Sequence, residues 1–257
     1  AGHPYGRGLT GTGDPTVVEA LTRDDLVRFH QTWLRPDNAR LFVVSDRPLS
    51  EVVAALETGF GTWQASAVSR GTKDFDVAIP DSQSRIILLD RPQSPQSVIF
   101  GGQVMPVTGR DDLVLLNAAN DVIGNGFLSR INQDIRETRG WSYGVFGNVY
   151  AMEHRMPYFV LAPVQADRTG DSLAALLAQY QHFTTDQGVT AAEAQRTIDG
   201  NIRQLPGGYE TSAAVLNALR SNALYGRPDD YLERLAPRYQ AMTPAEMDAA
   251  ARAALDA

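Results

Sequence analysis

The sequence contains no cysteine among its 257 residues. This absence excludes a thiol nucleophile, disulfide bonds and zinc sites built on thiolates. Lysine is nearly absent as well, since Lys73 is the only one and arginine supplies almost all of the positive charge. The formal net charge is −7, whereas nucleic-acid binding normally needs a basic surface. We therefore predict no nucleic-acid partner.

Long apolar runs are also missing. No stretch reaches the roughly 18 consecutive apolar residues that a membrane-spanning helix needs, so we predict no membrane span. Hydrophobic residues nevertheless make up 43% of the chain and aromatic residues 8%. This composition is typical of a packed globular protein.

The motifs of common hydrolytic sites are absent too. The four histidines are His3, His30, His154 and His182. None of them forms H-x-x-E-H or H-E-x-x-H, the spacings that put two imidazoles on one helix face towards zinc. No G-x-S-x-G nucleophile elbow occurs either. We predict no metal site and no catalytic residue in this chain alone.

The first part of the chain has the pattern of an incomplete domain. Thr22 and Asp25 form a capping box that opens a predicted helix over 22–34. The run "ARLFVVSD" at 39–46 is short and apolar enough for a buried strand, and a second helix is predicted over 49–60. One strand between two helices cannot bury both of its faces. We therefore interpret residues 1–64 as the remainder of a preceding domain, with exposed apolar surface that favours docking or self-association.

A second, longer pattern follows a predicted linker at 65–74, where hydrophobic periodicity is lost. From residue 75 to 257, strands are predicted first and helices dominate later, which is typical of an α+β fold with an antiparallel sheet and helices packed on one face. The preceding segment would then be a partial copy of a similar domain. The predicted strands lie near 84–91, 96–104, 141–152 and 157–166, and the predicted helices over 110–123, 127–138, 169–185, 190–204, 210–224, 228–239 and 243–255. Thr190 with Glu193, and Thr243-Pro244 with Glu246, have the capping-box pattern of helix starts.

One glycine-rich turn invites a functional interpretation. "IGNGF" at 123–127 precedes a predicted helix, and helix N-termini bind phosphate well. It lacks the Lys-Ser/Thr of a phosphate-binding P-loop. A turn that needs glycine backbone freedom is the simpler interpretation.

The stretch "NQDIRETRGWSYGV" at 132–145 supports two interpretations. In the structural one, Gly140 ends a helix, Trp141 and Tyr143 share one face of a strand, and the helix carries two solvent-exposed i,i+4 pairs, Arg130 with Asp134 and Gln133 with Glu137. In the functional one, the glycine turn brings Arg136 and Tyr143 over one groove. Two converging donors beside a sheet edge suit an extended peptide, whose carbonyls are regularly spaced acceptors.

The longer run "IGNGFLSRINQDIRETRGWSYGV" at 123–145 resembles the pitrilysin/insulinase-type zinc metallopeptidases, the inverzincins. The similarity lies in a Gly turn, an aromatic residue, Ser-Arg, then Ile-Arg-Glu and Gly-aromatic-small-Tyr. Upstream, "HPYGRG", "LTRDDLVRFHQTWLRPDNARLFVVSD" and "FGTW" resemble the later half of the family's preceding domain. Together these segments cover most of residues 1–150.

The resemblance implies four homologous α+β domains that enclose a substrate chamber, in one chain or in paired subunits. Zinc belongs to the first domain, which this chain lacks, so the implied partners are a zinc-bearing N-terminal half and a peptide substrate. Arg136 and Tyr143 match an Arg/Tyr pair that holds the substrate backbone near the scissile bond. The resemblance thus implies the non-zinc, substrate-binding part of a zinc metalloendopeptidase, inactive by itself.

Two alternatives stay open. Some members of the family are assembly or core subunits of larger complexes without catalysis, and a free-standing peptide-binding module is also compatible with the sequence. An intact H-x-x-E-H upstream or in a neighbouring gene would favour the peptidase. The residues do not determine the compartment. The resemblance to bacterial relatives makes a periplasmic parent plausible, and a cytoplasmic one stays open.

Overall fold

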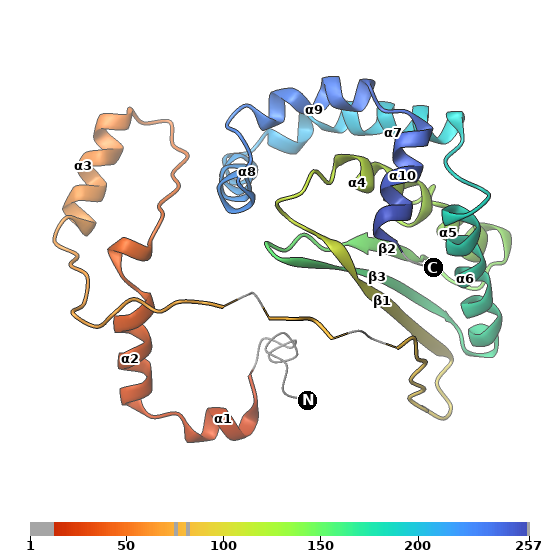
Figure 1. Ribbon diagram of the computed structural model, residues 1–257, viewed down its shortest axis with the longest axis horizontal. Helices are drawn as coiled ribbons and strands as arrows, with labels where there is room; N and C mark the ends of the chain where they lie inside the picture. Colours follow the sequence, from red (N-terminus) through yellow and green to blue (C-terminus); the bar gives the residue numbers. More distant parts are fainter. Residues whose placement is uncertain (1–12, 75–76, 81–82, 256–257) are drawn as a thin grey trace. The chain divides into compact units, whose positions relative to one another are not determined.

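The computed structural model describes residues 13–74, 77–80 and 83–255 (Figure 1). The chain divides into two compact units, residues 1–86 and residues 87–257, and each unit is described by itself. The domain limits expected from the sequence, with a linker at 65–74 and a complete domain from residue 75, stay a prediction.

The described part of the first unit contains short helices joined by extended chain. They are α1 (Pro15–Ala20), α2 (Arg23–Trp33), the 3-10 helix η2 (Pro36–Asn38) and α3 (Leu49–Phe60). The predicted capping box of α2 is confirmed. Thr22 Oγ1 accepts a hydrogen bond from Asp25 N at 3.3 Å, and Asp25 Oδ2 accepts one from Thr22 N at 3.0 Å. These bonds satisfy amides that the first helical turn leaves unpaired.

This unit has no apolar core within its described residues. Across 13–74, 77–80 and 83–86, the only buried residue is Arg35, which binds the Asp37 carboxylate at 2.6 Å. Large apolar side chains are exposed instead, among them Leu26 (61%), Phe29 (56%), Leu49 (77%) and Phe60 (47%). The helices of this unit therefore gain little from burial of apolar surface, which is normally the dominant stabilising term in folding.

Two strand predictions are wrong. The run at 39–46 is extended but belongs to no strand, and Leu41 and Val43 are about half exposed. The described residues of the 84–91 run likewise form no strand, and the four apolar residues from Ile86 to Leu89 are 69–83% exposed. A strand is stabilised by backbone pairing with a neighbour, and neither run has such a neighbour among the described residues.

The second unit is built on a three-stranded antiparallel sheet. Its strands are β1 (Gln96–Thr108), β2 (Phe146–Val149) and β3 (Arg155–Gln165), in the order β1-β3-β2. Leu161 of β3 pairs with Phe100 of β1 on one side and Phe146 of β2 on the other. The predicted strand at 141–152 is shorter than expected, because Val145 N donates to the Asn132 side chain instead of to a strand.

Helices pack on one face of this sheet, as the sequence predicts for this α+β fold (Figure 1). The first layer is α4 (Val114–Ile123), α6 (Thr169–Thr184) and α10 (Pro244–Ala254), and α7 (Ala191–Gln204) packs on α4 and on α9 (Tyr231–Gln240). α8 (Ser212–Tyr225) precedes α9. The core between sheet and helices includes Met105, Val122, Ile135, Met156, Val164, Phe183 and Met247. Within the described residues, no helix is long and apolar enough to cross a membrane.

A buried polar chain ties the sheet to α4 and α6. Tyr158 Oη donates to Asn120 Oδ1 at 2.7 Å and lies 2.7 Å from Tyr180 Oη. Asn120 Nδ2 in turn donates to the Gly147 carbonyl at 3.0 Å. Burial raises the pKa of both tyrosines, so both hydroxyls stay protonated and able to donate at neutral pH.

Candidate functional site

The candidate site is the segment that connects α4 to β2, residues 124–145. It opens with a turn at Gly126, whose φ of 92° lies in the left-handed region that favours glycine. The Gly126 carbonyl accepts from Ser129 Oγ at 2.9 Å. The predicted helix over 127–138 begins later, at Arg130, as the short α5 (Arg130–Asn132). The turn geometry therefore supports the simpler interpretation of the "IGNGF" run.

The helix continues as a π-helical turn, η3 (Gln133–Thr138). Arg139 N donates to the Asp134 carbonyl at 3.0 Å, five residues back, so one extra residue is accommodated in the turn. Gly140 has φ of 66°, which confirms the predicted glycine at the end of this helix. Single π turns often occur at functional sites, and Arg136 lies within this one.

Arg136 is held by two contacts, neither of which is a hydrogen bond. Its guanidinium carbon lies 4.1 Å from the centre of the Phe127 ring. Nη1 lies 2.7 Å from Glu137 Oε1, but this atom is buried and makes no hydrogen bond. The ion pair is partly exposed, with 30% of the Arg136 side chain accessible. Among the described residues, none accepts a hydrogen bond from this guanidinium.

Tyr143 lies at a bend and not on a strand, so the expectation that it shares a strand face with Trp141 is wrong. Ser142 anchors the bend, because its Oγ accepts from Gly144 N at 3.1 Å and also contacts the Pro163 carbonyl. The Tyr143 side chain is 91% exposed. No contact of its hydroxyl is found in the part of the chain that the structure describes.

The other two arginines of this segment differ from Arg136, because each donates at least one hydrogen bond to another residue. Arg130 Nε and Nη2 contact the Glu193 carboxylate at 2.8 and 2.7 Å, and Nη2 also donates to the Gly188 carbonyl at 2.8 Å. Arg139 Nε donates to Asp134 at 2.7 Å.

The predicted i,i+4 pairs are therefore wrong. Arg130 pairs with Glu193 on α7 instead of Asp134, and Glu137 contacts the neighbouring Arg136 instead of Gln133. Gln133 Nε2 donates to the Phe127 carbonyl at 3.1 Å. Tertiary neighbours and the wider π turn replaced the partners that α-helical spacing would supply.

The Arg130–Glu193 pair fixes the helix of the candidate site to α7. Glu193 is also the third residue of the capping box predicted with Thr190, which is confirmed, and its carboxylate accepts from Thr190 N at 2.9 Å. Burial by itself raises the pKa of Glu193, but the hydrogen bonds from Arg130 and Thr190 outweigh it and lower the pKa to about 2. The pair is therefore ionised over the whole neutral range.

Sequence reasoning did not assign a role to Asn132, which is buried with 1% exposure. Its Nδ2 donates to the Phe127 carbonyl at 2.8 Å, and its Oδ1 accepts from Val145 N at 3.0 Å. One amide side chain thus joins the residues before and after the turn. The only sequence signal was a polar residue between Ile131 and Ile135, both of which are fully buried.

No group of three or more His, Asp or Glu side chains within 13–74, 77–80 and 83–255 could hold a metal ion. His182 contacts Asp186 at 2.9 Å and His154 lies 4.0 Å from Glu153, and both histidines are at least one-third exposed. The described residues therefore do not fit a zinc site.

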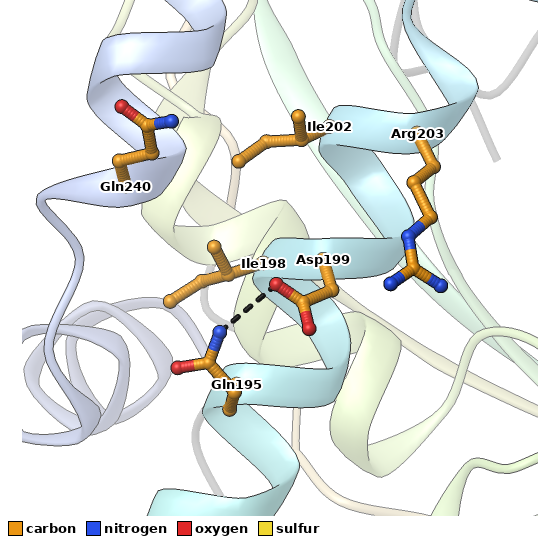
Figure 2. Close-up of a pocket in the computed structure, with 6 residues that line it drawn as sticks. All are labelled: Gln195, Ile198, Asp199, Ile202, Arg203 and Gln240. Atoms are coloured by element: carbon orange, nitrogen blue, oxygen red, sulfur yellow. Dashed lines mark hydrogen bonds between the residues drawn. The ribbon is translucent and has the colours of Figure 1, made fainter.

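An open pocket of about 360 Å³ lies elsewhere in the second unit, along α7 (Figure 2). Its lining residues are Gln195, Ile198, Asp199, Ile202, Arg203 and Gln240. Gln195 Nε2 donates to Asp199 Oδ1 at 2.9 Å, so this acid is satisfied within its own helix. Neither Arg136 nor Tyr143 lines the pocket, and its residues do not form an acid–base or nucleophile arrangement.

The comparisons with known proteins identify the family. The family model described as "Peptidase M16 inactive domain" matches residues 20–201. The chain belongs to this family, which confirms the resemblance to zinc metallopeptidases of the pitrilysin type.

Individual relatives agree with this assignment. An uncharacterized zinc protease of Mycobacterium leprae is 27% identical over 232 residues, which cover 88% of this chain and 50% of the relative. The crystal structure of a peptidase M16 inactive domain from Pseudomonas fluorescens superposes with a TM-score of 0.81 at 22% identity, over 95% of this chain and 57% of that one. A protease from Helicobacter pylori gives a TM-score of 0.78 at 14% identity, over 94% and 58%.

These structural likenesses show that the fold is shared. The chain spans about half the length of the curated relatives it matches. The family match assigns it to the C-terminal inactive domain of zinc-protease-like proteins.

Proposed function

We propose that this chain binds the peptide substrate in a zinc-dependent metalloendopeptidase, with Arg136 and Tyr143 donating hydrogen bonds to the substrate backbone. The contrast within one short segment carries the proposal. Arg130 and Arg139 each donate hydrogen bonds to other residues, whereas Arg136 pairs with Glu137 without a hydrogen bond and the Tyr143 side chain is 91% exposed. A substrate carbonyl would supply an acceptor for the Tyr143 hydroxyl and for the guanidinium nitrogens of Arg136 other than the buried Nη1.

The two residue types suit this role for different reasons. A guanidinium is permanently charged and offers several N–H donors in a fixed plane, whereas a phenol offers one neutral O–H donor. During peptide hydrolysis, negative charge develops on the carbonyl oxygen at the reacting centre, where zinc held by the other half would polarise that carbonyl. Donors already in place near this charge stabilise it at little cost in reorganisation.

The partner of this chain would be the zinc-bearing half of the same protease. The first unit supports this, since its described residues bury only Arg35 and expose apolar side chains such as Leu26 and Phe29. Exposed apolar surface of this extent is typical of an interface. The coverage of about half of each curated relative leaves room for such a half. Self-association through residues 1–64 is the competing outcome.

The proposal is tested in the complete protein, with the zinc-bearing half present and an internally quenched peptide as substrate. Loss of one donor to a developing oxyanion typically lowers turnover by about 10²–10³. We expect Arg136→Gln and Tyr143→Phe each to lower kcat/KM by up to that amount, with the zinc content unchanged. The isolated chain should hold no stoichiometric zinc and cleave no peptide.

Matched controls separate a lost donor from a general defect. Tyr150→Phe removes the hydroxyl of another exposed tyrosine, since Tyr150 is 54% exposed, and Arg168→Gln removes a surface guanidinium that is 45% exposed. Both controls should keep wild-type rates. Wild-type cleavage by either Arg136→Gln or Tyr143→Phe would refute the assigned roles. A complete protein that binds peptide without cleaving it would instead favour the assembly or peptide-binding alternative.

A further inference from the structure

Phe127 and Arg136 form a contact at the surface of the second unit, outside its apolar core. Phe127 is 58% exposed, so much of its ring is not covered by the core of the second unit. The guanidinium of Arg136 lies over its ring at 4.1 Å. The attraction between a cation and an aromatic face is directional, because the ring carries its negative charge density above and below its plane. The ring can therefore fix the position of this guanidinium without using any of its N–H donors.

The backbone that carries this ring is itself held in place. The Phe127 carbonyl accepts two side-chain hydrogen bonds, from Asn132 Nδ2 at 2.8 Å and from Gln133 Nε2 at 3.1 Å. Asn132 is buried, so its geometry is constrained by packing on all sides. The same Asn132 amide accepts from Val145 N at 3.0 Å, two residues beyond Tyr143. The buried Asn132 side chain thus links Phe127, whose ring contacts Arg136, to the bend that carries Tyr143.

We propose that Phe127, anchored by the Asn132 amide, is a positioning residue that holds the Arg136 guanidinium ready for the substrate. This inference rests on the proposed function, because it assigns Phe127 a role only through Arg136. Glu137 is the other contact of this guanidinium, with Oε1 2.7 Å from Nη1. Its carboxylate approaches Nη1 without forming a hydrogen bond, and its side chain is 47% exposed. A mobile arginine side chain loses conformational entropy when it binds a ligand. The contact with the Phe127 ring restricts the Arg136 side chain before binding, so less entropy is lost when the substrate binds.

A double-mutant cycle in the complete, zinc-containing protein tests the proposal. The variants are Phe127→Leu, Arg136→Gln and both together, assayed as kcat and KM on one quenched peptide. Phe127→Leu keeps an apolar side chain but removes the aromatic face. We expect it to lower kcat/KM by about 3- to 10-fold, as a weak to moderate cation–π contact implies. In the Arg136→Gln background the same change should have no further effect. Phe127→Trp, which keeps an aromatic face, should have the wild-type rate.

The controls distinguish a failure of the positioning role of Phe127 from a failure of the proposed substrate-binding function. Leu128→Ala alters the adjacent side chain, which is 52% exposed, and should leave the rate unchanged. If Arg136→Gln has no effect, the proposed function fails and the inference fails with it. If Arg136→Gln lowers the rate but Phe127→Leu does not, only the positioning role is overturned. The same holds if Phe127→Leu costs as much in the Arg136→Gln background as in the wild type.

A measurement on the isolated chain needs no activity. Aromatic ring currents shift the signals of groups above the ring, so the δ-methylene protons of Arg136 should resonate upfield of those of an exposed arginine such as Arg168. The shift should vanish in Phe127→Leu and persist in Phe127→Trp. An Arg136 signal at the position of an exposed arginine in the wild type would overturn the proposal, even if the leucine variant does not fold.

Discussion

The Arg130–Glu193 pair allows a quantitative prediction about stability. The Glu193 carboxylate accepts from Arg130 Nε and Nη2 at 2.8 and 2.7 Å and from Thr190 N at 2.9 Å. Only 15% of the Glu193 side chain is exposed. Glu193→Gln keeps the size and one acceptor oxygen but removes the charge. We expect this single change to destabilise the second unit, because both Arg130 and the start of α7 lose a charged partner.

The magnitude follows from the pKa. A fall from the usual 4.5 to about 2 in the folded protein corresponds to about 3 kcal/mol of stability linked to ionisation. This value is an upper bound, since the carboxylate retains some solvent and glutamine replaces part of the hydrogen bonding. We expect Glu193→Gln to lower the free energy of unfolding by about 2–3 kcal/mol at pH 7, which is in the range for a damaged, partly buried charge network.

The pH dependence gives the sign of the effect. The folded pKa of Glu193 lies below the unfolded value, so the contribution is fully present above about pH 4.5 and is lost as the pH falls towards 2. The difference between wild type and Glu193→Gln should therefore shrink to about half between pH 7 and pH 3. Urea unfolding followed by circular dichroism at both pH values measures it.

Glu246→Gln is the matched control. Glu246 closes the same kind of capping box at the start of α10, where its carboxylate accepts from Thr243 N at 3.0 Å. No arginine pairs with it among the described residues. Its replacement should cost only about 1 kcal/mol, the usual scale of a helix cap. Equal losses for the two variants, or a loss in Glu193→Gln that does not change with pH, would refute the assigned role of Arg130.

Two further predictions concern the core of the second unit and the first unit. Tyr158→Phe leaves the buried Asn120 Oδ1 without its donor and should lower the free energy of unfolding by about 1–3 kcal/mol, measured by urea titration; an unchanged midpoint would contradict this. In the isolated chain, the amides of α2 and α3 should exchange with solvent faster than those of α4, because α4 is buried and the described first unit has no core. Equal protection in a hydrogen-exchange experiment would show that the first unit is stable by itself.

The sequence by itself determined the helix starts that depend on near neighbours. Thr22, Thr190 and Thr243 each begin a helix with a reciprocal capping box, and all three were predictable. The hydrogen bonds of such a box join residues only three apart, so no distant part of the chain is needed. The α+β class was predicted from the order of strand and helix patterns along the chain. These patterns are readable because hydrophobic periodicity depends only on residues near each other in the sequence.

Only the tertiary structure decided which extended runs became strands and which ion pairs formed. The runs at 39–46 and 84–91 have the composition of strands, but pairing requires a partner that local sequence does not specify. Arg130 pairs with Glu193, sixty-three residues away in the sequence, because the fold brings α5 and α7 together. The correlated run at 123–145 was enough to indicate the family and to single out Arg136 and Tyr143. That Arg136 lies on Phe127 without donating a hydrogen bond, while Arg139 donates to Asp134, depends on three-dimensional packing and was visible only in the structure.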